Sequence, residues 1–239
     1  MTAKKGDFKT FYPTDVMETA GEIIFFWVAR MIMLGLYATK KIPFKNVYLH
    51  GLVLDAKGQK MSKSKGNVIN PLDLTDKYGT DAFRIGLVVG NTPGTSLALD
   101  ENRVKGYRNF ANKIWNASRF VLLQIGNSKF QITNYKINPR DKKILNNLNK
   151  LTKEITELMD DFKFYRAAEK IYHYFWHDFC DKIIEDYKKS KVSQYSLLEI
   201  LKTTLKLLHP FMPFVTEEIY QKLPLKNKKK FLMIESWPK

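Results

Sequence analysis

Apolar side chains recur every three or four residues over most of the chain beyond residue 100. Four segments carry this spacing, at about 101–124, 139–160, 165–188 and 196–208, and a shorter one follows at 214–223. The spacing gathers the apolar residues on one face, so each segment predicts a helix with one buried face. In the third segment the inward residues are Ala168, Ile171, Phe175, Phe179 and Ile183. Together the segments predict an antiparallel helical bundle.

The first 50 residues show a different pattern. The segments 16–18 and 47–49 predict two short strands, and between them Glu22 to Tyr37 predicts a helix that is apolar on nearly every face. A helix of that kind is expected to be buried. Strand, helix and strand in this order predict a parallel crossover, and ligands bind beyond the carboxyl ends of such strands. The edge expected here is formed by 19–22 and 50–51. One crossover is too little for a complete nucleotide-binding sheet, so this part looks like its second half.

The apolar run from Ile23 to Ala38 could be mistaken for a membrane span. It has 16 residues, carries Arg30 near its centre and follows Glu22. These features favour a core helix, and no membrane partner is expected. Two short helices at about 71–78 and 80–89 form a connector. Asn70-Pro71 and Asn138-Pro139 each predict an N-cap followed by proline at the first helical position, where the 71–78 and 139–160 helices begin. The expected domains are 1–98, an α/β part with the connector, and 99–239, an all-α bundle.

A cationic loop, Lys60-Met61-Ser62-Lys63-Ser64, follows the second strand, with Gly58 before it and Gly66 after it. Two lysines between hydroxyls and flanked by glycines describe a mobile loop that can close over a polyphosphate. On composition alone, a solvated polar turn is the more common explanation. The position of the loop after His50-Gly51 brings it to the expected ligand-binding edge, and this favours the functional interpretation.

Charge separates the two parts of the chain. The formal net charge is +16, of which residues 1–100 contribute +4 and residues 101–239 contribute +12. A basic second half suggests a polyanion partner, RNA or DNA first, although a lysine-rich proteome would also produce such a charge. One face of the 101–124 helix carries cations and amides that could contact phosphates and sugars, or could be an ordinary wet surface: Lys105, Arg108, Asn112 and Arg119.

Few residues indicate metal or redox chemistry. His173 and His177 are four residues apart on a predicted helix, close to Cys180, but no second cluster completes a zinc site, so no metal site is expected. Cys180 is the one cysteine, which excludes a disulfide within the chain and fits a reducing, cytoplasmic location.

Several strings together resemble one family. They are Glu18-Thr19-Ala20-Gly21-Glu22, Trp27-Val28-Ala29-Arg30-Met31, Leu49-His50-Gly51-Leu52-Val53, the loop Lys60 to Ser64 with Lys65-Gly66-Asn67, Asp100 to Val104, Gly106 to Lys113, and His209 to Phe214. The loop is similar to the KMSKS signature of class I aminoacyl-tRNA synthetases. The set as a whole resembles valyl-tRNA synthetases, and Trp115 to Phe120 looks valine-specific.

The resemblance implies activation of valine by ATP to valyl-adenylate, followed by transfer to the terminal ribose of valine tRNA. Mg²⁺ would arrive with ATP and have no dedicated protein site. Carried over by position, Lys63 would hold the ATP phosphates in the transition state, Lys60 would support the loop, and Ser62 and Ser64 would complete the phosphate-binding loop. Gly21 and Glu22 would lie at the ribose, and His50, Gly51 and Met61 near adenine. Trp27 would form a wall of the valine pocket.

The chain also departs from the family pattern. The family usually has Thr-Gly-x-Asp where this chain has Thr19-Ala20-Gly21-Glu22, and no His-x-Gly-His (HIGH) motif or editing insertion occurs. The resemblance is therefore to the C-terminal portion of the enzyme, and an N-terminal half with the HIGH motif is an expected partner. The chain alone is expected to be inactive. The alternative is a non-catalytic tRNA- or RNA-binding module that keeps the loop by descent.

Overall fold

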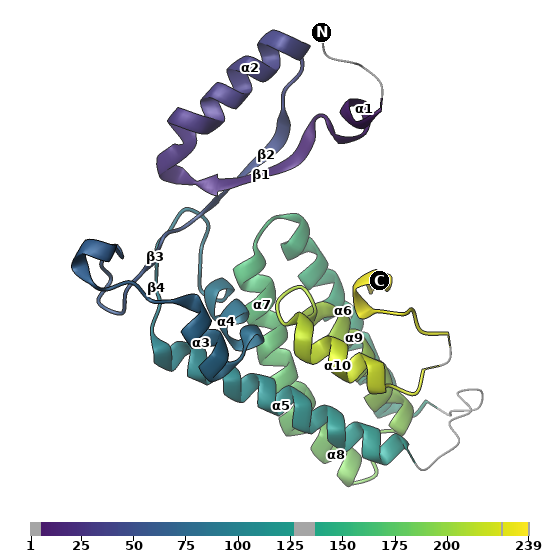
Figure 1. Cartoon of the computed structure of the whole chain (residues 1–239). Coiled ribbons are helices and arrows are strands. Elements are labelled where there is room, and N and C mark those ends of the chain that lie inside the picture. The colour runs from purple at the N-terminus through teal and green to yellow at the C-terminus, as the bar shows by residue number, and fades with distance from the viewer. Residues whose placement is uncertain (1–5, 127–136, 226, 239) are drawn as a thin grey trace. The chain divides into compact units, whose positions relative to one another are not determined.

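The computed structural model describes residues 6–126, 137–225 and 227–238. Its backbone forms two compact units, 1–68 with 91–99 and 69–90 with 100–239 (Figure 1). The connector 69–90 thus groups with the bundle in space. The boundary at residue 98, which concerns the domains of the whole protein, stays a prediction.

The first unit is built on the predicted parallel crossover. Strands β1 (Thr14–Ala20) and β2 (Phe44–His50) pair in parallel, with Thr14 opposite Phe44 and Ala20 opposite His50. A short helix α1 (Asp7–Phe11) precedes β1, where the sequence predicted only a connection. A second parallel pair joins β3 (Val53–Leu54) to β4 (Leu97–Ala98). The sequence pattern missed β4 because two residues are too few to show a period.

The helix between β1 and β2 corrects one expectation. It begins as a 3₁₀ turn η1 (Gly21–Ile23), continues as a π-helical turn η2 (Ile24–Val28) and ends as α2 (Ala29–Thr39). The prediction that it is buried is wrong within the described residues, because Val28 is its one buried side chain and Phe25 is 78% exposed. A helix that is apolar all round needs neighbours on several sides, and this unit offers two short strand pairs. By length and composition alone, Gly21–Thr39 could also cross a membrane.

The second unit is helical and has a continuous core (Figure 1). Its helices are α3 (Pro71–Tyr78), α4 (Thr80–Val88), α5 (Glu101–Ile125), α6 (Pro139–Asp160), α7 (Phe164–His173), η5 (Tyr174–Ile183), α8 (Ile184–Lys188), α9 (Gln194–Leu208) and α10 (Pro213–Lys222). The predicted N-caps at Asn70 and Asn138 are confirmed, since each side-chain amide oxygen accepts a hydrogen bond from a backbone N–H of the first turn. The five residues predicted to face inward from 165–188 are all buried.

The connector is tied to the bundle by a buried carboxylate. Asp81 of α4 is 6% exposed and accepts hydrogen bonds from the backbone N–H groups of Phe214 and Val215, at 3.2 and 2.6 Å. These N–H groups open α10 and have no partner inside that helix. Burial raises the pKa of Asp81, and the two hydrogen bonds from α10 oppose the rise. One side chain thus caps a helix that begins 132 positions further along the chain.

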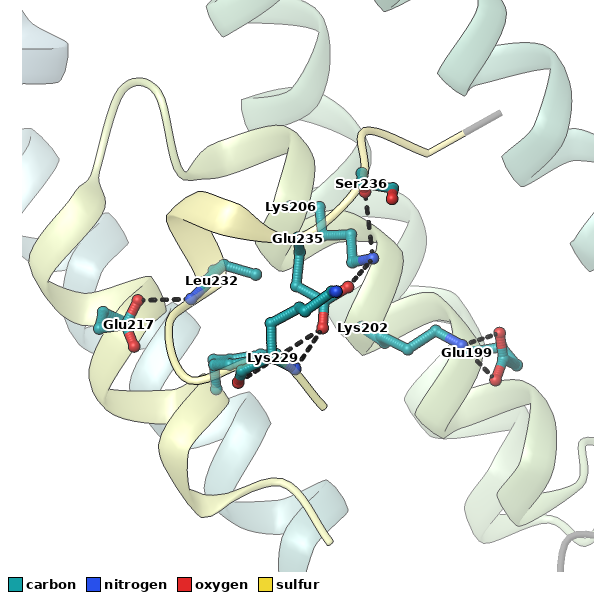
Figure 2. Close-up of polar contacts among 9 residues, drawn as sticks. Glu199, Lys202, Lys206, Glu217, Lys229, Leu232, Glu235 and Ser236 are labelled. Carbon is teal, nitrogen blue, oxygen red and sulfur yellow. Dashed lines mark hydrogen bonds and ion pairs between the residues drawn. The ribbon is translucent and has the colours of Figure 1, made fainter. Parts of the chain in front are cut away.

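A carboxylate also holds the C-terminal segment on the bundle. Glu235 follows a 3₁₀ turn η6 (Leu232–Ile234), and its Oε2 lies 2.9 Å from Lys206 Nζ on α9. Its Oε1 accepts hydrogen bonds from the backbone N–H of Lys229 and the hydroxyl of Tyr220. Figure 2 shows Lys206 and Lys229 converging on this carboxylate, while Glu217 accepts from the N–H of Leu232. We call residues 229–237 with these contacts the C-terminal strap.

Candidate functional site

The two strands of the crossover end at the same edge of the sheet, where the sequence predicts ligand binding. Because Ala20 pairs with His50, the two strands end side by side, and Gly21 and Gly51 follow directly. Gly21 is exposed, and a Cβ at that position would meet no other atom within 4 Å. The predicted residues of both strand ends therefore share one edge, as the crossover rule requires.

His50 is oriented by its neighbours at this edge. Its Nδ1 lies 3.0 Å from the carbonyl oxygen of Gly51, and its Nε2 lies 3.6 Å from Oε1 of Glu18. A carbonyl only accepts hydrogen bonds, so Nδ1 carries the hydrogen in that contact. The ring is thereby held beside the point where the chain leaves β2.

Gly51 is needed for packing of the backbone. A Cβ at this position would lie 1.4 Å from the carbonyl oxygen of Thr95, so no side chain fits unless the 92–95 turn moves. That turn is itself fixed, because the N–H of Gly94 donates to the carbonyl of Leu49 at 2.9 Å. The resemblance places Gly51 near adenine, which stays a prediction, and the close approach in the structure is that of the chain itself.

The cationic loop leaves β3 through a tight turn at Asp55. The N–H of Asp55 donates to the carbonyl of Gln59, and Gly58, at φ 74°, donates back to the carbonyl of Asp55. A positive φ suits glycine, which has no Cβ to clash. The loop then forms a 3₁₀ turn η3 (Lys63–Lys65) that ends at Gly66, also in the left-handed region. Both flanking glycines thus serve turns, as the sequence suggested.

The two predicted lysines have different surroundings. Nζ of Lys60 lies 3.3 Å from Oε2 of Glu22, so the loop and the strand edge are joined by an exposed ion pair. Lys63 lies on the exposed 3₁₀ turn, and no ion-pair or hydrogen-bond partner of its side chain occurs in residues 6–126, 137–225 and 227–238. The hydroxyls of Ser62 and Ser64 lie 3.2 Å apart. The structure therefore brings Glu22, Lys60 and the strand edge together and leaves Lys63 free to move.

Trp27 and Met61 complete the predicted site. Trp27 lies on η2 and is 56% exposed, and Met61 is half-buried. Nothing in the described structure tests their roles at the amino-acid pocket and at adenine, so both stay predictions.

The predicted RNA-facing residues line one exposed face of α5. Lys105, Arg108, Asn112 and Arg119 are all exposed, and their spacing of three, four and seven residues places them on one side of the helix. No acidic partner of Arg108 or Arg119 occurs in the described part of the chain. By contrast, Arg103 turns inward, and its Nε donates to the carbonyl of Gly86. We call the four exposed residues the basic face.

His173 and His177 contact each other and an acidic neighbour. The rings of His173 and His177 stack with centroids 5.7 Å apart, and Nδ1 of His177 lies 3.4 Å from Asp181, which also pairs with Lys113 at 2.7 Å. No group of three or more potential metal ligands occurs among residues 6–126, 137–225 and 227–238.

Both parts of the chain match models of known protein families. Residues 1–100 match the family model for tRNA synthetases class I (I, L, M and V), and residues 141–239 match the anticodon-binding domain of tRNA ligase. The two parts of the chain are thus similar to two domains of tRNA synthetases. The chain's resemblance to the valine enzymes is confirmed by relatives named Valine--tRNA ligase. Those of Clostridium tetani and Carboxydothermus hydrogenoformans are each 45% identical and cover 98% of this chain.

The chain spans just over a quarter of those curated relatives, 28% and 27% of their lengths. Solved structures agree on the fold. The LeuRS of Agrobacterium radiobacter K84, in complex with tRNA and LeuAMS, aligns over 95% of this chain and 28% of its own, with a TM-score of 0.78 and 23% identity. Methionyl-tRNA synthetase of Mycobacterium tuberculosis aligns over 92% of this chain and 46% of its own, with a TM-score of 0.73 and 19% identity. The partial Rossmann-like part followed by a helical bundle is therefore a class I synthetase arrangement.

Two residues that hold the loop were not among the predicted site residues. Asp55 and Asn67 flank the loop and are joined by their side chains at 2.8 Å. Both residues lie close to the Lys60–Ser64 loop in the sequence. Their pairing across a twelve-residue separation, however, has no periodic signal.

Proposed function

We propose that this chain supplies the phosphate-closing loop and the tRNA-binding bundle of a valine–tRNA ligase. The observation that carries the proposal is the 45% identity to valine–tRNA ligases over 98% of the chain, with the loop intact. The complete enzyme would activate valine with ATP in the cytoplasm and esterify the terminal ribose of valine tRNA. Since the chain spans 28% of a relative's length, the HIGH motif would come from a further polypeptide segment.

In the first step the valine carboxylate attacks the α-phosphorus of ATP, and pyrophosphate leaves with the electrons of the broken bond. Mg²⁺ would neutralise part of the charge on the phosphates. Among the described residues the side chain of Lys63 has no ion-pair or hydrogen-bond partner, and it lies on an exposed turn, so it can move to the departing pyrophosphate as its charge grows. Lys60, paired with Glu22, would keep the base of the loop at the strand edge.

In the second step a hydroxyl of the terminal ribose attacks the carbonyl carbon of the adenylate, and AMP leaves. Because pyrophosphate has already departed, Lys63 has no role there. The bundle would hold the anticodon arm, in keeping with the family of residues 141–239, and the basic face of α5 would contact phosphates. The basic second half favours this polyanion, since neutralised phosphates contribute affinity at low salt.

Valine-dependent exchange of pyrophosphate into ATP tests the proposal. The 239-residue chain alone should show no exchange. Addition of a polypeptide with the HIGH motif and the rest of the catalytic domain should restore it with valine and much less with isoleucine. Lys63→Ala should then lower the exchange rate roughly a hundred- to thousand-fold, with little change in ATP affinity.

The matched control is Lys57→Ala, which removes another exposed lysine from the turn just before the loop. It should leave exchange close to the parental rate. If the completed enzyme shows no exchange with valine but binds tRNA, the non-catalytic RNA-binding alternative is correct. If Lys63→Ala only raises the ATP concentration required, the transition-state role is wrong.

A further inference from the structure

At the base of the loop an isolated antiparallel bridge joins Leu54 to Lys60, and two side chains connect its start to its end. Asp55, just before the turn, is 9% exposed, and Asn67, just after the loop, is half-buried. Nδ2 of Asn67 donates to Oδ2 of Asp55 at 2.8 Å. We call this pair the Asp55–Asn67 clasp.

Each end of the clasp also holds backbone. Oδ1 of Asp55 accepts hydrogen bonds from the N–H groups of Lys57 and Gln59, at 2.9 and 2.8 Å. Oδ1 of Asn67 accepts from the N–H of Ser62 at 2.9 Å, and its Nδ2 reaches the carbonyl of Lys60 at 3.3 Å. The two side chains thus fix the backbone on both sides of Met61.

The amide of Asn67 has one orientation that satisfies these partners. Turned over, its oxygen would face the Asp55 carboxylate and the Lys60 carbonyl, and its NH₂ would face the N–H of Ser62. Asp55 therefore determines which way Asn67 points. The hydrogen bonds from Gln59 and Asn67 lower the pKa of Asp55, which keeps the carboxylate charged at neutral pH.

The clasp stops short of the tip of the loop. Residues 63–66 are exposed, and their backbone hydrogen bonds are those of one short turn, from Lys65 to Ser62 and from Gly66 to Lys63. The loop thus has a fixed segment, held by side chains, and a tip whose hydrogen bonds among the described residues are those of a 3₁₀ turn and of the Ser62 and Ser64 hydroxyls. A catalytic loop that must move one lysine while keeping its base in place needs this division.

We propose that Asn67, oriented by Asp55, is a positioning residue that fixes Lys60 and Ser62 so that the tip with Lys63 closes on the ATP phosphates in one geometry. The proposal rests on the proposed function for its catalytic consequence. The fixed backbone geometry is a property of the chain alone and can be measured without chemistry.

The test compares Asn67→Asp, Asp55→Asn and the double variant that exchanges the two residues. Asn67→Asp sets two carboxylates against each other, and Asp55→Asn removes the charge that orients Asn67. The exchanged pair again has one amide NH₂ facing one carboxylate, and it retains acceptors for the N–H groups of Ser62, Lys57 and Gln59. It gives up only the longer hydrogen bond from residue 67 to the carbonyl of Lys60, at 3.3 Å. Asn149→Asp is the control, because it makes the same chemical change at an exposed position of α6.

The first measurement is amide hydrogen exchange in the 239-residue chain. Exchange at Ser62 should be about tenfold faster or more in both single variants, near parental in the exchanged pair, and unaltered in the control. Parental exchange at Ser62 in both single variants would overturn the proposal. So would fast exchange that the exchanged pair does not reverse.

The second measurement is single-turnover formation of valyl-adenylate in the completed enzyme. The single variants should lose about tenfold or more in the rate at saturating ATP, with the Kd for ATP within about threefold, and the exchanged pair should recover. A loss confined to the Kd would overturn positioning in favour of ground-state binding. If the parental enzyme forms no adenylate, the proposed function fails, and the Ser62 measurement alone decides whether the clasp holds the loop.

Discussion

Removing the charge of Glu235 should destabilise the bundle. The carboxylate of this residue is 17% exposed, and it is held by the N–H of Lys229, the hydroxyl of Tyr220 and the ammonium of Lys206. These hydrogen bonds, that from Lys229 first, lower its pKa from 4.5 to about 2. Glu235→Gln keeps the size of the side chain and removes the charge that these three donors stabilise.

The magnitude follows from the pKa. One pKa unit corresponds to about 1.4 kcal/mol, so a carboxyl group whose pKa falls from 4.5 to about 2 on folding contributes about 3 kcal/mol to the free energy of unfolding at pH 7. Glu235→Gln should lower that free energy by about 2–3 kcal/mol, because glutamine keeps part of the hydrogen bonding. It also removes the negative charge that pairs with the ammonium of Lys206, which is 18% exposed and also donates to the carbonyl of Ser236.

The contribution of Glu235 to the free energy of unfolding decreases as the pH falls. The folded pKa of Glu235 is depressed, so its contribution is fully present above about pH 4.5 and is lost as the pH falls from about 4.5 to about 2. Urea unfolding of parent and variant, followed by helical circular dichroism at pH 7 and at several values down to pH 3, measures this. The difference between the two proteins should be large at pH 7 and shrink toward pH 3.

A control variant separates this effect from loss of any surface charge. Glu218→Gln breaks an exposed ion pair in which the side chain of Glu218 is 59% exposed and that of Lys222 is 48% exposed. It should lower the free energy of unfolding by less than about 0.5 kcal/mol. If Glu235→Gln unfolds at the same urea concentration as Glu218→Gln, the strap does not depend on this carboxylate. A stability difference that stays constant between pH 7 and pH 3 would equally refute the argument, because it could not arise from a titrating group.

Two further predictions concern the site. Arg108→Ala combined with Arg119→Ala should weaken tRNA binding and reduce the slope of log affinity against log salt by about 1.4–1.8, since each phosphate contact contributes roughly 0.7–0.9. Filter binding over a range of salt concentrations measures both, and a slope equal to the parental one would show that the basic face is only solvated. Gly51→Ala should displace the turn at Thr95, because the added Cβ would lie 1.4 Å from its carbonyl oxygen. Amide exchange at Gly94 should then be at least tenfold faster, and parental exchange there would contradict the packing argument.

The controls for these two tests lie on the same elements. Asn109→Ala and Asn116→Ala on α5 remove exposed amides without removing charge, so the salt slope should not change. Gly21→Ala adds a Cβ that meets nothing within 4 Å at the same strand edge, so Gly94 should exchange as in the parent.

Local signals in the sequence were sufficient where one element determines its own structure. Asn138-Pro139 predicted the start of α6, and the side chain of Asn138 indeed accepts from the N–H of Asp141. The inward residues from Ile171 to Ile183 were predicted from spacings of four, although the segment Tyr174–Ile183 is π-helical. A π turn holds more residues than an α turn, so a spacing of four keeps the side chains on one face.

Contacts between distant segments had no such signal. That Asp81 caps α10, and that Asp55 orients Asn67, depends on which parts of the chain meet in space. Both are short polar residues that also occur in ordinary turns, so the sequence alone assigned neither a partner. The parallel pairing of Leu97 with Val53 was missed for the same reason.

Burial of the crossover helix was predicted wrongly, and the reason bears on function. The bundle covers its own apolar residues, with Phe110, Phe175 and Phe179 all at 0% exposure, so its core needs no further surface. The crossover helix instead exposes Phe25, Phe26 and Trp27, and burying one such side chain contributes about 1.5–3 kcal/mol. Covering these side chains would therefore contribute several kcal/mol, from which the entropic cost of association has to be subtracted. Because the same helix begins at Glu22, the partner of Lys60, the surface that covers it would also fix one wall of the loop's binding edge. The bundle thus buries its own core, whereas the apolar side chains at the start of the crossover helix are exposed in the described part of the chain.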